Sequence, residues 1–180
     1  MARRVSLSGA HLAANQVAEH HALVEEALHL YYTAASPGFE MRFALYTEDE
    51  VLAERDERLY EAGAASAMMV LASIEAAFRV DYLRRCYAKY RDGLSRTFRT
   101  LYQEQGAKVS LSDDLIEAWR NHGAMTARLV GDLRSAFGYR HWLAHGRYYV
   151  ARLGREYDFP SVYNLAREVE MAISTQRSMN

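Results

Sequence analysis

The residues with the clearest capacity for chemistry lie together in residues 138–149, which read GYRHWLAHGRYY. This segment holds two histidines, two arginines and four aromatic residues. An imidazole gains or loses a proton near neutral pH, and a guanidinium binds phosphate through a planar fork of N–H donors. Acid–base chemistry on a phosphate ester is therefore the chemistry that Arg140 and His145 favour, with His141 beside them.

The spacing of these residues limits how they can act together. On an ideal helix His141 and His145 share a face, whereas Arg140 and His145 are five residues apart and rotated by about 140°. For both to act on one phosphate, the helix must start late or distort, and Gly138 is expected to interrupt it. Alternatively, each motif meets its copy in a second subunit. Three apolar residues of the segment are expected to anchor it to the core: Tyr139, Trp142 and Leu143.

Arg140, the polar residue His141 after it, and His145 after four intervening positions resemble the signature of the HEPN superfamily. The resemblance implies an all-α bundle with the motif late in the chain. It further implies a metal-independent endoribonuclease, often a toxin of a toxin–antitoxin or phage-defence system, that acts as a homodimer with facing motifs. It covers about residues 64–176, while residues 1–60 lie outside the resemblance and are expected to form a helical extension.

Under this resemblance Arg140 would hold the phosphate and His145 would move a proton. RNA carries its own nucleophile, the 2′-hydroxyl, so neither a cofactor nor a metal is expected. His145 would take the 2′-hydroxyl proton or give one to the departing 5′-oxygen, leaving a 2′,3′-cyclic phosphate or its hydrolysed form. One histidine cannot easily serve as both base and acid, which favours a dimer. His141 would orient the phosphate or His145.

The neighbouring residues are expected to bind the rest of an RNA substrate. Arg147 and Arg152 are candidates for flanking phosphates, and Tyr148 or Tyr149 for stacking on a base. The alternative is a non-catalytic helical module that binds RNA or a protein, and an antitoxin or defence protein is a possible partner.

Glu75 lies in the apolar middle of a predicted long helix, where an ionised carboxylate is costly unless it is paired. An arginine of the motif is a natural partner, and many HEPN proteins have a glutamate on the equivalent helix, so Glu75 is expected to orient Arg140. The alternative is that Glu75 pairs with another arginine for structural reasons alone.

Neither of the two histidine clusters in the sequence has the arrangement of ligands that a metal site needs. His141 and His145 have no obvious third ligand nearby. His21, Glu25 and His29 form one stripe, but its outer members lie about 12 Å apart along a helix axis and cannot surround one ion. That stripe is expected to be a solvated face.

Helical periodicity predicts an all-α bundle built around two or three long helices. Thr47 to Glu50 form a capping box that opens an acidic stretch, and Gly63 is expected to mark a joint before the next helix. No strand-like alternation, internal repeat or long linker appears, so residues 1–180 are expected to form a single domain. The predicted helices cover about 22 residues after Ser8, then residues 64–91, 95–105, 112–119, 125–137 and 160–174.

The composition of the chain supports this fold class. The chain has 180 residues, two prolines and ten glycines, too little turn material for an all-β sandwich. A single cysteine, Cys86, excludes an internal disulfide and suits a reducing compartment. With no signal peptide or long apolar run, a cytoplasmic protein away from membranes is expected.

The net charge of −1 conceals an uneven distribution along the chain. Residues 1–75 hold five basic and twelve acidic side chains, residues 76–155 hold fifteen and seven, and the last 25 hold two and four. The middle block is therefore strongly basic and ends on the motif. Taken at face value, a net charge near zero argues against a nucleic-acid partner. That argument fails if Arg140, Arg147 and Arg152 line one open groove, and it holds if they pair with the acids of the first block.

Overall fold

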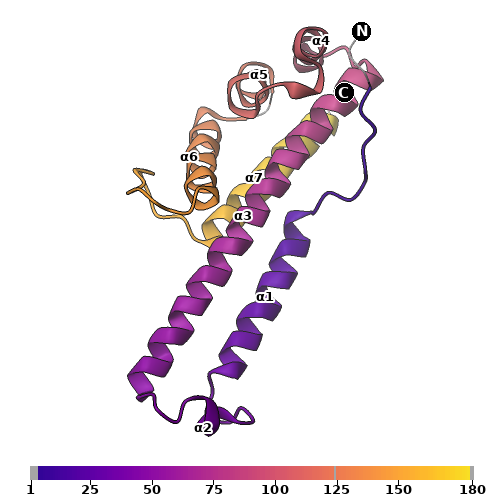
Figure 1. The fold of residues 1–180 in the computed structure, drawn as a ribbon. Coiled ribbons are helices and arrows are strands. Elements are labelled where there is room, and N and C mark those ends of the chain that lie inside the picture. The colour runs from indigo at the N-terminus through magenta and orange to yellow at the C-terminus, as the bar shows by residue number, and fades with distance from the viewer. Residues whose placement is uncertain (1–3, 124, 179–180) are drawn as a thin grey trace.

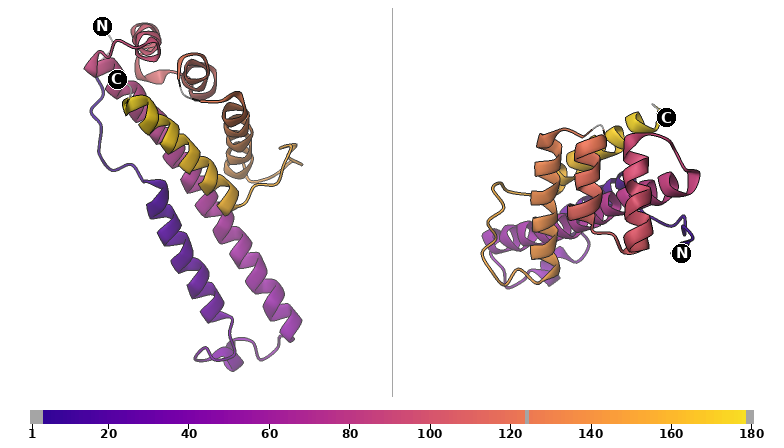
Figure 2. Two further views of the ribbon diagram at one scale, coloured as in Figure 1. Left: turned by 180° about the vertical axis from the view of Figure 1, so that it is seen from behind. Right: turned by 90° about the horizontal axis from the view of Figure 1, so that it is seen from above.

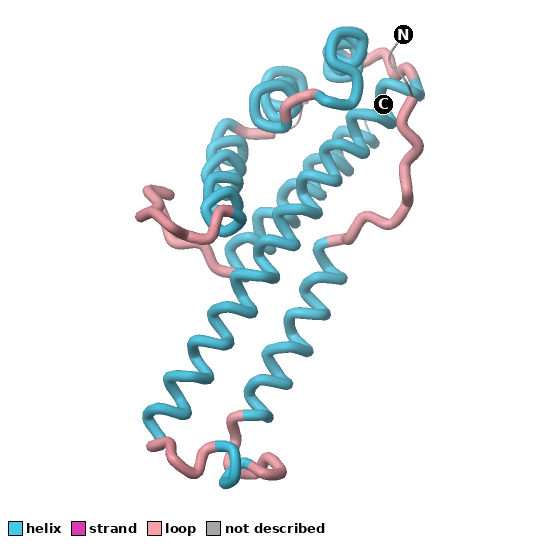
Figure 3. The backbone as a smooth tube through the Cα atoms, in the orientation of Figure 1, coloured by secondary structure: helices cyan, strands magenta, loops and turns pink. Residues whose placement is uncertain are grey.

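The prediction of an all-α fold is confirmed by the computed structural model, which describes residues 4–123 and 125–178. Within these residues there are seven α-helices and no strand (Figure 3). A 3₁₀ turn, Gly106–Lys108, and a π-helical turn, Leu111–Leu115, connect α4 to α5. The α-helices are α1 (Ala14–Tyr31), α2 (Phe39–Arg42), α3 (Glu48–Ala88), α4 (Gly93–Gln105), α5 (Ile116–His122), α6 (Ala127–Ala144) and α7 (Phe159–Ser178).

The 41-residue helix α3 is the axis on which the other helices pack. Helix α1 lies along its N-terminal half, and α7 lies along its C-terminal half (Figure 1). Helices α4, α5 and α6 follow one another along a further side of that C-terminal half (Figure 2). The N-terminal half of α3 therefore projects with α1 as a two-helix arm, and α2 closes its far end.

Helix α3 begins at the predicted capping box, which is confirmed. The Thr47 backbone N–H donates to Glu50 Oε2 at 2.7 Å, and the Glu50 N–H donates to Thr47 Oγ1 at 3.3 Å. The predicted joint at Gly63 is wrong, because α3 passes through it without a break. A glycine costs a helix only about 1 kcal/mol, and burial of Ala64 and Ala67 after it outweighs that cost. The N-terminal extension and the predicted core thus share one helix.

Helix α6 likewise continues through Gly138, where the sequence predicts an interruption. Ala136 and Tyr139 on either side of the glycine are buried, and Leu153 lies over it, 3.6 Å from where a Cβ would stand. Packing on both sides of Gly138 keeps the helix intact. Arg140 and His141 are consequently held on a continuous, well-anchored helix.

The first and last helices also differ from their predicted bounds. Helix α1 begins at Ala14, because Gly9 takes a left-handed conformation (φ +71°) and Ser8 accepts a hydrogen bond from Ala10 instead of capping a helix. Helix α7 extends to Ser178, one turn beyond the predicted end.

The main core lies where α3 meets α4 to α7. Large apolar side chains from four of these helices are fully buried there, including Leu71, Phe78, Phe98, Trp119 and Leu133. A second, small cluster of Tyr32, Phe43 and Val51 closes the far end of the arm.

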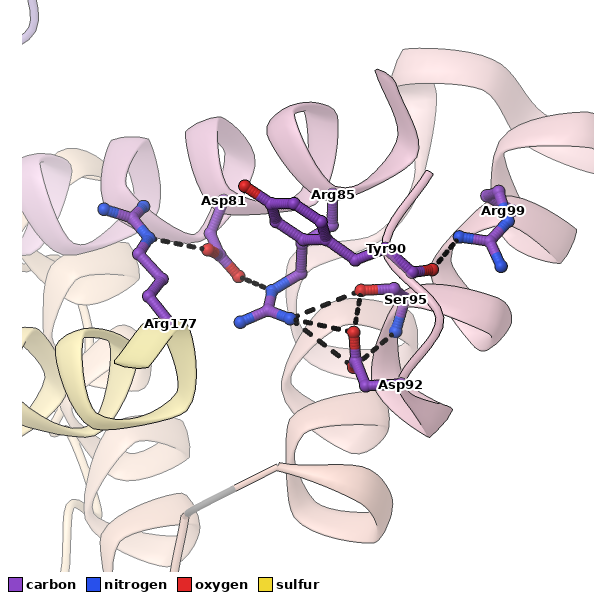
Figure 4. Close-up of polar contacts among 7 residues, drawn as sticks. All are labelled: Asp81, Arg85, Tyr90, Asp92, Ser95, Arg99 and Arg177. Carbon is purple, nitrogen blue, oxygen red and sulfur yellow. Dashed lines mark hydrogen bonds and ion pairs between the residues drawn. The ribbon is translucent and has the colours of Figure 1, made fainter. Parts of the chain in front are cut away.

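A buried ion network joins α3 to α4 and α7 (Figure 4). Arg85 is 0% exposed; its Nε donates to Asp81 Oδ2 at 2.7 Å, and its Nη1 donates to Ser95 Oγ at 3.3 Å. Asp92 accepts from the same Nη1 at 3.4 Å, and Arg177 Nε reaches the other oxygen of Asp81 at 3.1 Å. The network ties three helices together inside the core.

Helix α3 is also long and apolar enough to cross a membrane, judged by length and composition alone. Its most apolar 18-residue window is 44% buried within the bundle. The central helix of a packed bundle meets the same criterion, so α3 needs no membrane to account for its apolar character.

Candidate active site on helix α6

The C-terminal end of α6 carries the motif and is closed by a Schellman motif. The Gly146 N–H donates to the Leu143 carbonyl at 3.1 Å, and the Arg147 N–H donates to the Trp142 carbonyl at 3.0 Å. Gly146 has φ +75°, a conformation that favours glycine. The turn leaves His145 as the residue just after the last helical position, so its orientation depends on this cap.

A cavity of about 620 Å³ lies beside α6, between α3 and the turn that precedes α5. Three of its lining residues belong to the predicted site or adjoin it: Glu75, Arg140 and His141. The remaining lining residues are mostly apolar: Met68, Met69, Ala72, Ser110, Leu111, Ser112, Phe137 and Ala144. The cavity thus has one charged end and one apolar wall.

Arg140 and Glu75 meet at the charged end. Arg140 Nη1 donates to Glu75 Oε2 at 2.6 Å, and Arg79 Nε donates to Glu75 Oε1 at 2.8 Å. Both carboxylate oxygens are therefore engaged, and the three groups together carry a net positive charge. Arg140 spends one of its five N–H donors here and makes no other hydrogen bond among the described residues. Its side chain is 35% exposed.

The environment of Glu75 determines its charge state. Burial alone would raise the pKa of the Glu75 carboxyl, but the hydrogen bonds and positive charges of Arg79 and Arg140 hold that pKa below its ordinary value. Glu75 is thus ionised at neutral pH and can orient Arg140.

Glu75→Gln is expected to destabilise the chain more at pH 7 than at pH 3. A carboxyl with a depressed pKa in the folded state stabilises the fold above its unfolded-state pKa, about 4.3, and loses that effect as the pH falls through the folded-state pKa. Urea unfolding of both proteins at pH 7, 5 and 3 measures the difference. Glu57 is an exposed carboxylate on the same helix, and Glu57→Gln should lower the free energy of unfolding at pH 7 by less than Glu75→Gln does. A difference that stays constant with pH would contradict the assignment.

The two histidines of the motif lie in contact with each other. The rings of His141 and His145 have centroids 4.1 Å apart and planes inclined at 49°. Both residues are exposed, and neither imidazole makes a hydrogen bond within the described part of the chain. His141 lines the cavity with Arg140, whereas His145 is not one of its lining residues.

The residues predicted to bind flanking RNA are not gathered at the cavity. Arg147 donates to Glu61 through both terminal nitrogens, at 2.6 and 2.9 Å, and thereby ties the turn after α6 to α3. Tyr148 is 82% exposed and packs edge-on against Tyr149. Arg152 is exposed in the adjoining loop.

These contacts decide what the basic block of the sequence contributes. Arg140 and Arg147 both pair with glutamates of the acidic first block, Glu75 and Glu61. Of these three arginines only Arg140 lines the cavity, and the acidic block partly neutralises the basic one. Arg152 has no ion pair among the described residues, so the acidic block neutralises two of these three arginines.

Comparison of the chain with models of known protein families, with curated proteins and with solved structures finds no match. The HEPN assignment stays a hypothesis. It rests on the Arg140–His145 motif, the all-α architecture and the contact of Glu75 with Arg140.

Groups outside the motif have structural explanations. The sequence predicts His21 on a solvated face, but it is buried against Phe159, with ring centroids 3.8 Å apart. No cluster of metal-ligating side chains occurs among the residues that the structure describes. Burial raises the pKa of the Cys86 thiol to about 12, which disfavours the reactive thiolate.

Sequence reasoning missed two parts of this site. Arg79 could have been found, because its spacing of four residues from Glu75 is that of a helical ion pair. The apolar wall could not, because Met68, Leu111 and Phe137 come from three separate elements. The apolar pattern of the sequence also predicts Met68 to be a core or dimer contact; in the structure it is 39% exposed at the cavity, which does not fit the core alternative.

Proposed function

We propose that this protein is a metal-independent endoribonuclease of the HEPN type that cleaves RNA by attack of the 2′-hydroxyl. The observation that carries the proposal is the position of Arg140, which lines an open cavity together with His141, has most of its N–H donors unused, and lies next in the chain to a histidine whose ring contacts that of His145. A role as the toxin of a toxin–antitoxin or phage-defence system is a further part of the proposal and rests on the resemblance alone.

The proposed reaction needs a base, an acid and a group that stabilises negative charge. The 2′-oxygen attacks phosphorus as its proton passes to the base, and the bond from phosphorus to the 5′-oxygen breaks as that oxygen takes a proton from the acid. Arg140 would stabilise the charge on the non-bridging oxygens. Glu75 does not touch substrate in this scheme and acts as a positioning residue for Arg140.

A homodimer is part of this proposal for a geometric reason. The entering and leaving oxygens of a phosphoryl transfer are roughly in line, so base and acid must lie on opposite sides of phosphorus. Two rings 4.1 Å apart in one chain lie on the same side. A second copy with its motif facing the first would supply the other side.

Cleavage of single-stranded RNA in the presence of EDTA tests the function. We expect fragments that end in a 2′,3′-cyclic phosphate or its hydrolysed form, separated on a denaturing gel and identified by mass. DNA of the same sequence is the matched control and should stay intact, because it lacks the 2′-hydroxyl. Loss of all cleavage with EDTA, or equal cleavage of DNA, would refute the proposal.

A second candidate function is a non-catalytic helical module that binds a protein. Large apolar side chains are exposed near the far end of the α1–α3 arm, with Met41 86% and Leu45 96% exposed, and Tyr46 lies beside them. A chain that binds a partner through this end and cuts no RNA would favour the second candidate.

A further inference from the structure

The apolar wall of the cavity has no role in the chemistry assigned to Arg140 and the histidines. Met68 from α3, Phe137 from α6 and Leu111 from the π-helical turn face the same space, and Met68 remains 39% exposed. Leaving such side chains in contact with water is unfavourable, at about 25 cal/mol per Å². An apolar surface directly beside a guanidinium with unused donors points to a ligand that has both an apolar and an anionic part.

From this we infer that the cavity binds one nucleotide of the substrate RNA, with its base on the apolar wall and its phosphate on Arg140. The inference rests on the proposed function and adds a base-binding subsite to it. A volume of about 620 Å³ falls within the range of small-ligand sites, roughly 300–1,000 Å³. Unstacked bases pack well on aromatic side chains such as Phe137, and the Met68 thioether adds a polarisable contact.

The polar groups at the cavity are consistent with this orientation of the nucleotide. Arg79 and Arg140 neutralise the Glu75 carboxylate and leave a net positive charge beside the proposed phosphate. Ser110 is occupied, since its hydroxyl accepts from the Asp113 N–H at 3.2 Å and bonds the Asp113 carboxylate at 3.1 Å. Ser112 also lines the cavity, and its hydroxyl makes no hydrogen bond among the described residues. Ser112 is the group placed to bind a base edge, and so to select among bases.

Calorimetric titration of the wild-type chain with the four nucleoside 3′-monophosphates tests the inference. These compounds have no second nucleotide attached and cannot be cleaved, so binding is measured alone. We expect at least one to bind. Ala72→Trp fills the cavity from an exposed position, and Met68→Glu places a carboxylate on its wall. Each should weaken binding about tenfold or more, the size of loss that removal of a base-stacking contact causes.

Matched controls separate this effect from general damage. Ala22→Trp on α1 and Met171→Glu on α7 make the same changes at exposed positions outside the cavity lining, and both should bind within twofold of wild type. Ser112→Ala should change the order of preference among the four bases. Inorganic phosphate, titrated in parallel, should be insensitive to Ala72→Trp.

The outcomes distinguish the inference from the function on which it rests. RNA cleavage without nucleotide binding, or binding that Ala72→Trp and Met68→Glu leave unchanged, overturns the base subsite and leaves the endoribonuclease standing. Nucleotide binding with the expected variant pattern but no RNA cleavage keeps the subsite and refutes the catalytic proposal.

Discussion

Arg140→Ala is expected to lower the rate of RNA cleavage by about 10²- to 10³-fold, the usual cost of removing one donor that stabilises transition-state charge. His145→Ala is expected to lower it by about 10²- to 10⁴-fold, as for loss of a general acid or base. Single-turnover cleavage of a labelled RNA measures both. The fold should survive the first change, because Glu75 keeps its 2.8 Å contact with Arg79, and the cost to stability should be about 1 kcal/mol.

The controls for these variants lie on nearby surfaces of the same chain. Arg134→Ala removes an exposed arginine of α6 that pairs with Glu117 at 2.7 Å, outside the cavity. His20→Ala removes an exposed histidine of α1. Both should cut RNA at the wild-type rate. If Arg140→Ala and His145→Ala cut as fast as these controls, the assignment of the chemistry to this motif is wrong.

Arg85→Ala is expected to reduce the free energy of unfolding by about 3–5 kcal/mol, because it leaves Asp81 with a single partner and removes the buried cation that Asp92 faces. A domain of ordinary stability has only about 5–15 kcal/mol to lose. Burial by itself would raise the pKa of Asp92, but hydrogen bonds with Ser95 and the charge of Arg85 hold that pKa below its ordinary value. Urea unfolding followed by circular dichroism measures the change.

Two comparison variants identify the cause of that loss. Arg84→Ala changes the adjacent arginine, which is exposed, and should stay within about 0.5 kcal/mol of wild type. Arg85→Met combined with Asp81→Leu removes both charges and should be more stable than Arg85→Ala, because the penalty comes from a buried carboxylate that has lost its buried partner. If the double variant is as unstable as Arg85→Ala, the loss of stability comes from packing instead.

Local sequence signals predicted much of the fold. The pairing of Thr47 with Glu50 marked the start of α3, and helical periodicity placed the other long helices. These signals depend on backbone groups within a few residues, so they survive in any tertiary context. Glycine signals were less informative: Gly63 and Gly138 lie inside helices, because burial of neighbouring residues outweighs the modest helix penalty of glycine.

Residue types in the sequence also revealed part of the candidate site. An ionised residue in an apolar stretch requires a partner, so residue type alone could match Glu75 to the arginine-rich motif. The geometry of the motif was less accessible: α6 does not start late or break, and His145 reaches His141 across the C-terminal cap of the helix.

The sequence by itself determined that this protein is all-helical, where α3 begins, and which short segment carries the residues suited to phosphate chemistry. Those properties follow from local periodicity, capping and residue type. Only the tertiary structure decided that Arg147 is clamped by Glu61, 86 residues away, that Arg85 is buried in an ion network, and that an apolar wall lies beside Arg140. Each of these depends on which distant helix faces meet along α3, and the packing of the whole core selects that arrangement.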